Sequence, residues 1–547
     1  MTQTDDFTRD LSPLLEGRYD CMDRISLNGF YPLGCSSGGL LRWWNALTAG
    51  QTLTEDKLRA FSGTFSRRVR AWAEKNGVPV VDFVIGDKTK HEQAEKLQPG
   101  DPAFTGVFAV FVARAPAPIW EAYTNPKGKV VLYRPKRPAL VNHYYFQIVD
   151  RQWGHVTIRM CGHPPFPALI MLNGHEWVER TAGEKAVTFA KRSNCFVEGS
   201  DLPAIDRLAS RLLAPGALLG LAEVCERWIY SACLCFGLTR EEQERSGFRY
   251  QFSVFQIEYS RNFIFKSGRE LDTYYQSLIE RIWPALDVPR LKTIFGRNKR
   301  PHLNAGRGLE KRIEHAEHDL TVFKLKFSRL ELKMYDKGAR VLRIEMIARH
   351  VADLRCGRLL ARISEMLGKM RDTLCNFLNV VQAVHGGHID GRQLDALPAP
   401  SAYGAKRIAG VDLQKPRIQA VASAVIALAA APNGFTAEEL AAQTKRHRPR
   451  LRRKYGVRQA AYDLRKLRAK GLVQRIGQTR RYRARKRAIQ TLAAWFILRE
   501  KVIKPVLAGA GQPRAGRPRR CFTPLDEHCR ALKQQLHRTL IDLKLAA

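Results

Sequence analysis

One predicted turn brings together four side chains that can act on a phosphate ester. Within residues 332–345 the run LKMYDKG is followed by VLRIE. A β-hairpin there would place four groups close together: Tyr335, Lys337, Arg343 and Glu345. A tyrosine hydroxyl can attack phosphorus, cationic side chains bind phosphate oxygens, and a glutamate can hold a divalent metal. This segment is therefore the first candidate for chemistry.

Two interpretations of the hairpin stay open. In the catalytic one, Tyr335 is a nucleophile, or a carboxylate cluster holds Mg²⁺. The run YDCMDR, near the start of a predicted strand, supplies Asp20 and Asp23 as partners for Glu345 in such a cluster. In the structural one, a cross-strand Lys–Glu or Arg–Glu pair holds the hairpin, and Lys337 at the turn meets a backbone phosphate. Enzymatic activity stays undecided, and Mg²⁺ is expected only for a nuclease.

No other metal site is predicted. The residue types of a zinc site occur at His143, His155, Cys161 and His163, but their spacings match no zinc signature. The chain has 11 scattered cysteines, which indicates reduced thiols and not a disulfide framework.

The strongest binding signal lies in a basic C-terminal region. Between Ala441 and Gln490 there are 19 Lys or Arg residues and one acid, Asp463. The pattern predicts an apolar helix, a short helix that begins with a Thr436–Glu439 capping box, a longer helix, a two-stranded hairpin and a further helix. This is the order of a winged helix-turn-helix, in which the third helix lies in a major groove.

The cations of this region divide between two predicted elements. Three would lie on the third helix, near phosphates or base edges: Arg458, Arg465 and Arg468. Four would lie on the hairpin, near the flanking backbone or the minor groove: Arg475, Arg480, Arg481 and Arg483. The alternative is a winged helix that contacts only protein. Farther on, the run GRPR resembles an AT-hook core, which would place Arg517 in a narrow minor groove, and the alternative there is a basic linker.

The rest of the pattern predicts a multidomain α+β protein. We expect a β-containing front domain, a helical middle, a basic β-hairpin with one wet face and a C-terminal winged helix-turn-helix. The predicted boundaries are as follows: 1–200, α+β front domain; 201–318, helical region; 319–384, β-hairpin plus long helix; 385–410, linker; 411–507, winged-helix nucleic-acid-binding domain; 508–547, basic linker and terminal helix.

Three resemblances bear on function. The run YDLRKLRAKGLVQRIGQTRRYRA looks like winged-helix proteins of the MarR type. LKMYDKG with VLRIE resembles the tyrosine–lysine and LRxE box of replication initiators from filamentous phages and small plasmids. Those proteins nick one DNA strand with a tyrosine, using a metal held by a His-hydrophobic-His pair, and this chain contains no His-x-His.

The third resemblance spans most of the chain. Shared runs are YDCMDRISLNGFYP, HYYFQIVDRQWGHVTIRM, PPFPALIMLNGHEW, RSNCF, KMYDKGARVLRIE and the winged end. They are similar to runs in a group of uncharacterised bacterial proteins, which occur in multiple copies as mobile genes do. This resemblance implies the domain layout and carries no activity.

Composition points to a polyanionic partner. The 547 residues include 91 Lys or Arg and 52 Asp or Glu, a net charge of +39. Cations that neutralise phosphates release condensed counterions, so this excess favours nucleic acid, DNA or RNA. No stretch is long and apolar enough to span a membrane, and the acidic start MTQTDDFTRD excludes a signal peptide, so a cytoplasmic location is expected.

We therefore expect a nucleic-acid-binding protein of mobile-element type that grips duplex DNA or structured RNA, with the protein part of a ribonucleoprotein as one form. A metal-dependent nuclease, nickase or transposase and a winged-helix transcriptional regulator are the alternatives. A regulator is usually shorter and nearer to neutral charge, and a nuclease should show convergent acids or histidines. The oligomeric state and the nucleic-acid sequence recognised stay open.

Overall fold

The computed structural model describes residues 5–285, 322–386 and 395–499, except at 88, 192–193, 200, 215, 328, 338–339, 405, 432 and 449–454, together with 503 and a few positions between 524 and 538. The described residues form two compact units. The sheet unit consists of Leu15–Phe265 and Lys326–Arg371, and the helical unit is drawn from residues 1–14, 266–325 and 372–547.

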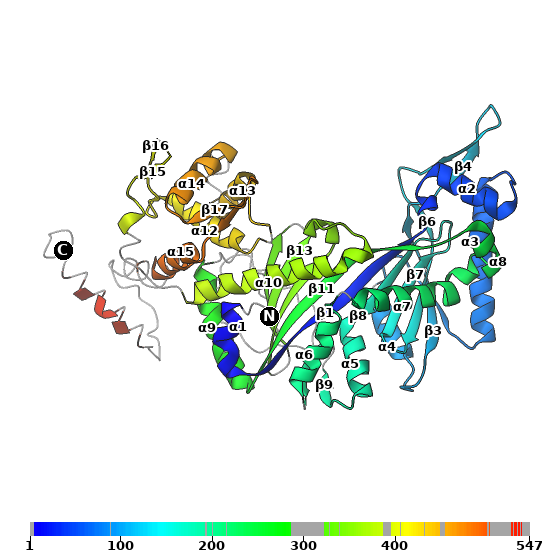
Figure 1. Cartoon of the computed structure of the whole chain (residues 1–547), viewed down its shortest axis with the longest axis horizontal. Helices are drawn as coiled ribbons and strands as arrows, with labels where there is room; N and C mark the ends of the chain where they lie inside the picture. The colour runs from blue at the N-terminus through cyan, green and yellow to red at the C-terminus, as the bar shows by residue number, and fades with distance from the viewer. Residues whose placement is uncertain are drawn as a thin grey trace, which may run out of the picture. The chain divides into compact units, whose positions relative to one another are not determined.

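A ten-stranded mixed sheet organises the sheet unit, in the order β12-β13-β14-β11-β1-β8-β7-β6-β3-β2 (Figure 1). Its strands are β1 (Leu15–Phe30), β2 (Val80–Phe83), β3 (Gly106–Ala117), β6 (Ala139–Asp150), β7 (Gly154–Cys161), β8 (Ala168–Asn173), β11 (Gln251–Phe265), β12 (Val322–Phe327), β13 (Leu330–Lys337) and β14 (Val341–Ala348). Neighbours pair antiparallel in every pair whose register is known except β2 with β3, which is parallel.

Helices cover the sheet because apolar side chains repeat on one side of each. In α3 (Glu55–Lys75) the buried residues recur at helical spacing, and Phe65 lies 4.7 Å from Tyr144 of β6, ring centre to ring centre. On the opposite face, Ala94 of α4 (Lys90–Leu97) packs against Phe108 and Phe111 in one apolar cluster. The other helices of this unit are α2 (Ser37–Thr48), α5 (Gly174–Glu184), α6 (Leu202–Arg211), α7 (Ala217–Ala232) and α8 (Arg240–Ser246).

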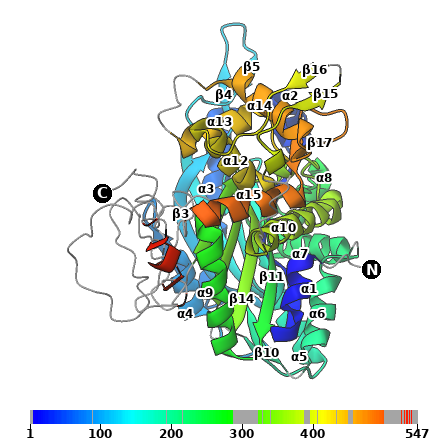
Figure 2. The same ribbon diagram turned by 90° about the vertical axis from the view of Figure 1, so that its left-hand side faces the viewer.

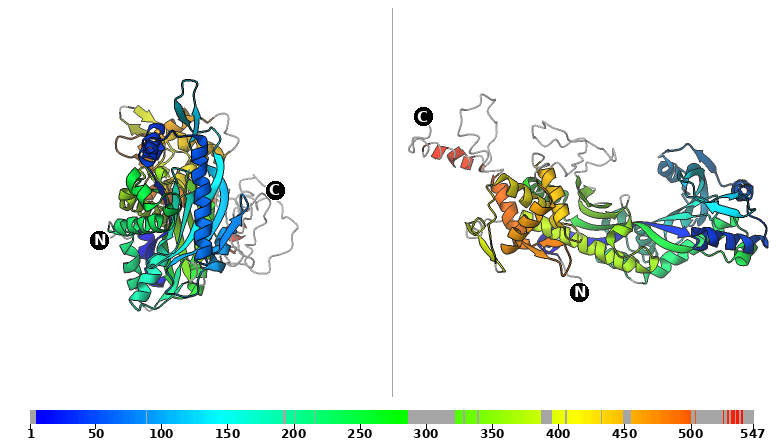
Figure 3. Two further views of the ribbon diagram at one scale, coloured as in Figure 1. Left: turned by 90° about the vertical axis from the view of Figure 1, so that its right-hand side faces the viewer. Right: turned by 90° about the horizontal axis from the view of Figure 1, so that it is seen from above.

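Two short hairpins lie outside the large sheet. One pairs β4 (Glu121–Thr124) with β5 (Val130–Tyr133), and the other pairs β9 (Phe189–Lys191) with β10 (Phe196–Gly199). The β4–β5 hairpin projects beyond the strands of the sheet (Figures 2 and 3). We call residues 121–133 the arm.

The predicted boundaries at residues 200 and 318 are wrong, because one sheet crosses both. The region expected to be mainly helical contains the 15-residue strand β11. This strand pairs with β1 on one side and with β14 on the other. The expected front domain and basic hairpin are therefore neighbours in one sheet, and the described part of the middle region supplies the strand that joins them.

The expectation of a wet hairpin face is also wrong. All eight residues of β14 are buried, and in β13 only Lys333 and Asp336 are partly exposed. The hairpin itself is confirmed: β13 and β14 pair from Leu330–Ala348 to Lys337–Val341. Its alternating polar residues face a covered, polar side of the sheet instead of solvent.

The helical unit contains α1 (Asp6–Leu11), α9 (Gly268–Ala285), most of α10 (Ile363–His385), α12 (Pro416–Ala429), α13 (Ala437–His447), α14 (Val457–Ala469) and α15 (Lys486–Leu498). It also has two hairpins, β15 (Ser401–Tyr403) with β16 (Lys406–Ile408), and β17 (Val473–Arg475) with β18 (Tyr482–Ala484). The first hairpin lies inside the predicted linker, which therefore contains structure. No helix among the described residues has the length and apolar character needed to cross a membrane.

Candidate functional site

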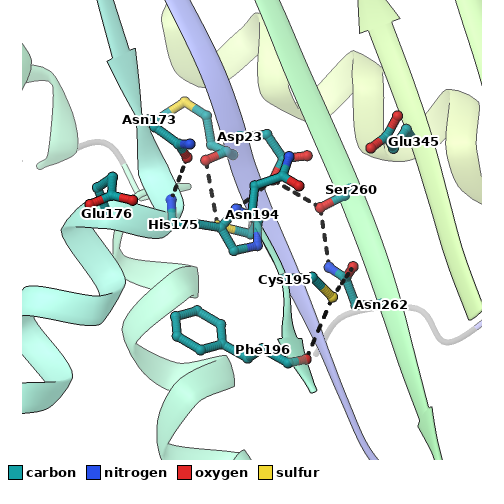
Figure 4. A network of polar contacts seen from close by, with 12 residues as sticks. Asp23, Asn173, His175, Glu176, Asn194, Cys195, Phe196, Ser260, Asn262 and Glu345 are labelled. Atoms are coloured by element: carbon teal, nitrogen blue, oxygen red, sulfur yellow. Dashed lines mark hydrogen bonds and ion pairs between the residues drawn. The ribbon is translucent and has the colours of Figure 1, made fainter. Parts of the chain in front are cut away.

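On the polar side of the sheet, side chains of the β13–β14 hairpin lie beside side chains of β1 and β11. Strand register aligns four side chains on one rung: Tyr19, Asn262, Arg343 and Tyr335. The next rung holds Cys21, Ser260, Glu345 and Lys333. Residues opposite one another on neighbouring strands share a face, so these eight side chains form one patch on the sheet. Asp23 joins the patch from β1 (Figure 4).

Arg343 is the centre of this patch. Its side chain is fully buried, and it donates to Glu345 Oε1 at 2.7 Å and to Asp23 Oδ2 at 2.6 Å. It also donates to the carbonyl of Asn194 at 2.7 Å and to Asn262 Oδ1 at 3.1 Å. Four of the five guanidinium N–H donors are thus engaged inside the protein. The sequence prediction that Arg343 contacts nucleic acid is wrong, because no phosphate can reach it.

The carboxylate of Glu345 is the second element of the network. Burial by itself raises its pKa, but the Arg343 and Lys333 charges and a hydrogen bond from Tyr335 lower the pKa of Glu345 to about 2. Tyr335 donates to Glu345 Oε1 and is itself buried. Burial and the Glu345 charge raise the pKa of the Tyr335 hydroxyl well above its usual value. Removing the proton from the Tyr335 hydroxyl is therefore harder than usual, which opposes a role as a nucleophile.

Asp23 and Glu345 lie together as the nuclease interpretation expected, but the cation between them is Arg343. The remaining oxygen of Asp23, Oδ1, accepts from Ser260 Oγ at 3.1 Å. The same atom lies 2.8 Å from Nδ1 of His175, out of line with a ring N–H bond. Both carboxylates are thus occupied by protein groups, as structural ion pairs are.

Asp20 does not join this cluster. It lies opposite Arg261 in the β1–β11 register, on the other face of the sheet from Asp23. Arg261 donates to both Asp20 oxygens at 2.7 and 2.8 Å, and Tyr259 donates to Oδ2 at 2.6 Å. Asp20 therefore cannot join Glu345 in a metal cluster, since its side chain lies on the opposite face of the sheet, whereas Asp23 shares the face of Glu345. Both aspartates also lie in the middle of β1 and not near its start.

A close helix approach covers the network from one side. The first residue of α5, Gly174, lies so near β1 that an added Cβ would be 1.8 Å from the Met22 carbonyl oxygen. Only glycine allows this contact, and it places His175 over Asp23. Burial lowers the pKa of His175, although Asp23 opposes the shift. His175 Nε2 lies 3.3 Å from the Tyr19 hydroxyl, which completes the cover.

One group of donor atoms has the composition of a metal site. Among the described residues, Cys21, Asp23 and His175 are the only three whose ligand atoms lie within 4.8 Å of one another. A metal would need the Cys21 thiolate, and burial raises the pKa of that thiol well above its usual value. It would also compete with Arg343 for Asp23. These three residues are therefore explained more simply as part of the ion-pair network.

Lys337 is likewise placed inside the protein, contrary to the prediction that it contacts nucleic acid. Its side chain is buried, and its ammonium group donates to Asn194 Oδ1. Burial and the Arg343 charge lower the pKa of Lys337 to about 8. Because β13 continues to Lys337, the residue lies in the strand and on the covered face.

The described part of the C-terminal region contains three helices, α12, α13 and α14, followed by the β17–β18 hairpin and α15. Thr436 and Glu439 form the expected capping box at the start of α13, and Gly471, at φ +66°, follows α14. α12, α13 and α14 pack together, and Phe435, just before α13, exchanges two 2.8 Å backbone hydrogen bonds with Tyr482 of β18. α14 and the hairpin are therefore anchored to one small core.

The seven arginines of this region that are predicted to contact nucleic acid differ in how exposed they are and in which protein groups they bond to. Four are exposed and have no acidic partner among the described residues: Arg458, Arg465, Arg480 and Arg483. Arg475 is exposed but bonds to turn carbonyls of its own hairpin. Arg468 is half-buried, 5.9 Å from the Tyr482 ring centre. Arg481 is bound by the Gly434 carbonyl and by Glu439 at 3.0 Å, so its role is to hold the hairpin.

Arg517 lies outside the described residues. The sequence missed Asn194, His175 and Asn262 as parts of the network, because each is polar and isolated in its own segment. A signal existed only for Asn262, which lies two residues from Ser260 in an alternating run.

No protein-family model, curated protein or solved structure matches this chain. Its function is therefore inferred from the arrangement of its side chains.

We expect Arg343→Met to destabilise the sheet unit strongly, because Asp23 and Glu345 would stay buried without their cation. The loss is about 3–5 kcal/mol, which lowers the thermal midpoint of a unit of about 300 residues by about 5–8 °C. Arg207→Met is the matched control: its ion pair with Asp201, at 3.4 Å, is exposed and contributes little. Equal midpoints for the two variants in a thermal melt would show that the Arg343 ion pairs are dispensable.

Proposed function

We propose that this protein binds duplex nucleic acid through a winged helix-turn-helix formed by α12–α14 and the β17–β18 hairpin. In this arrangement α14 is the helix that enters a major groove, and the hairpin is the wing that follows the flanking backbone. The partner is duplex DNA or structured RNA. The mobile-element resemblance of the chain is compatible with either, and a ribonucleoprotein is one form that such a protein takes.

The observation that carries this proposal is the set of exposed arginines without acidic partners on α14 and the hairpin. Only three acidic residues occur in residues 437–448 and 455–499, and two of their carboxylates are bonded to other side chains. Asp463 is buried and is bound by Tyr455 at 3.0 Å and Arg417 at 3.2 Å, and Glu439 holds Arg481. Positive charge therefore stays uncompensated on the outside of α14 and the hairpin, where it attracts phosphate.

The nickase alternative is weakened by the network around Arg343. A nicking tyrosine needs an accessible hydroxyl and a metal beside it, whereas Tyr335 is buried and its carboxylate neighbour is bound to Arg343. No specific feature favours the regulator alternative. We therefore argue for binding as the function and assign no reaction.

The exposed arginines generate a direct test. In the full chain, Arg458, Arg465 and Arg483 are changed together to Ala, and binding to a duplex DNA and to an RNA hairpin is titrated at several salt concentrations. Each phosphate contact contributes about 0.9 to the slope of log K against log salt. We expect the slope on the preferred duplex to fall by about 2.7, with an unchanged melting temperature because all three side chains are exposed.

The matched control changes three exposed arginines elsewhere: Arg269, Arg371 and Arg407. It removes the same charge from the chain but none from α14 or the hairpin, so the slope should change by less than one. Wild-type binding that does not depend on salt would contradict the proposal. So would a triple variant that binds as the control does.

Tyr335→Phe tests the nickase alternative. Because the Tyr335 hydroxyl donates to Glu345 and stays protonated, we expect no covalent protein–DNA adduct from either the wild type or the variant. Adducts on supercoiled or single-stranded DNA with Mg²⁺ or Mn²⁺ are detected on denaturing gels. A wild-type adduct that disappears in Tyr335→Phe would reverse the assignment and make Tyr335 a catalytic residue.

A further inference from the structure

The arm is the most prominent feature of the sheet unit that the network and the C-terminal region leave unexplained. Its strands β4 and β5 pair from Glu121–Tyr133 to Thr124–Val130. The two strands are joined by the turn NPKGK, in which Gly128 has φ +74°. Asn125 Oδ1 accepts from the backbone N–H groups of Lys127 at 3.1 Å and Lys129 at 2.9 Å. The tip is therefore an ordered turn that displays two lysines.

The base of the arm is fixed to the body of the sheet unit. The indole N–H of Trp120 donates to the Gly34 carbonyl at 2.8 Å, and the Arg134 guanidinium lies 4.3 Å from the Trp120 ring centre. Glu55 at the start of α3 accepts from the Ala122 N–H at 3.0 Å. Leu132 is buried on the inner side of the hairpin. A projection with an anchored base presents its outer side chains in a defined position.

Those outer side chains are basic and aromatic. Tyr123 and Tyr133 are 52% and 42% exposed, with ring centres 5.7 Å apart on the side opposite Leu132. Five exposed cations lie within residues 121–137: Lys127 and Lys129 in the turn of the arm, and Arg134, Lys136 and Arg137 directly after β5. The only acid in this range is Glu121, which accepts from the Tyr133 hydroxyl at 2.6 Å. The arm and the four residues after it therefore combine exposed aromatic faces with more exposed cations than acids.

We propose that the arm is a second nucleic-acid site and that it binds unpaired nucleotides. Exposed tyrosines stack on bases, and lysines beside them contact the backbone, which is the chemistry of sequence-tolerant single-strand binding. Bases paired in a duplex do not expose the faces on which the two tyrosines would stack, so the tyrosine pair favours unpaired nucleotides. This inference rests on the proposed function and adds a second class of substrate to it.

The test uses the full chain with Tyr123 and Tyr133 both changed to Ser. Binding to a fluorescent single-stranded oligothymidine and to a duplex of equal length is measured at one salt concentration. Stacking on a tyrosine contributes at least about a fivefold affinity per base. We expect the double variant to bind the single strand at least about 25-fold more weakly than the wild type, and the duplex within twofold of it.

A matched control removes similar exposed apolar area on another loop of the same unit, by Val84→Ser with Ile85→Ser, whose side chains are 75% and 60% exposed. This control should bind both probes as the wild type does. Single-strand binding by the tyrosine variant equal to that of the control would overturn the arm proposal and leave the duplex proposal standing. A wild type that binds duplex but no single strand would do the same, and one that binds neither would overturn both.

Discussion

The burial of one permanently charged group, the guanidinium of Arg343, constrains the centre of the sheet. A buried cation is tolerated only when carboxylates and carbonyl oxygens replace the lost water. Asp23 of β1, Glu345 of β14 and Asn262 of β11 supply these oxygens from three strands, and Asn194 supplies one from the segment before β10. The ion pairs therefore require that strands from distant parts of the sequence lie in one register.

The charged residues fall into two groups: those that are bonded to one another inside the protein, and those that are exposed at its surface. Around Arg343 the carboxylates of Asp23 and Glu345 are bonded to protein cations and hydroxyls, so their charges are balanced within the protein. On α14 and the β17–β18 hairpin the situation is reversed, because exposed arginines outnumber the acids and the nearest acids are engaged elsewhere. On the sheet unit, the five exposed cations of residues 121–137 outnumber the one acid of that range, Glu121. Among the described residues, exposed positive charge without acidic partners thus lies at the surface and not at the Arg343 network.

Local patterns in the sequence predicted the elements well and their assembly poorly. The β13–β14 hairpin and the capping box at Thr436 depend on neighbours within about ten residues, and both are confirmed. Strand β11 was missed because Ser260 and Asn262 alternate toward a buried network, so the run lacks an exposed polar face. Arg343 looked like a surface cation because the residues that bury it, His175 and Asn194, lie about 150 residues earlier in the chain.

Binding through the exposed arginines can be tested by photocrosslinking the purified full chain to the nucleic acid that copurifies with it, with the crosslinked peptides mapped by mass spectrometry. If the exposed arginines bind nucleic acid, crosslinks should fall in residues 455–485, with a second group in residues 121–137 where the bound strand has unpaired bases. The peptides that carry Asp23, Tyr335 and Arg343 should stay free of crosslinks. Crosslinks concentrated on those three residues would contradict binding through the exposed arginines. So would a purified protein that carries no nucleic acid and binds none when it is added.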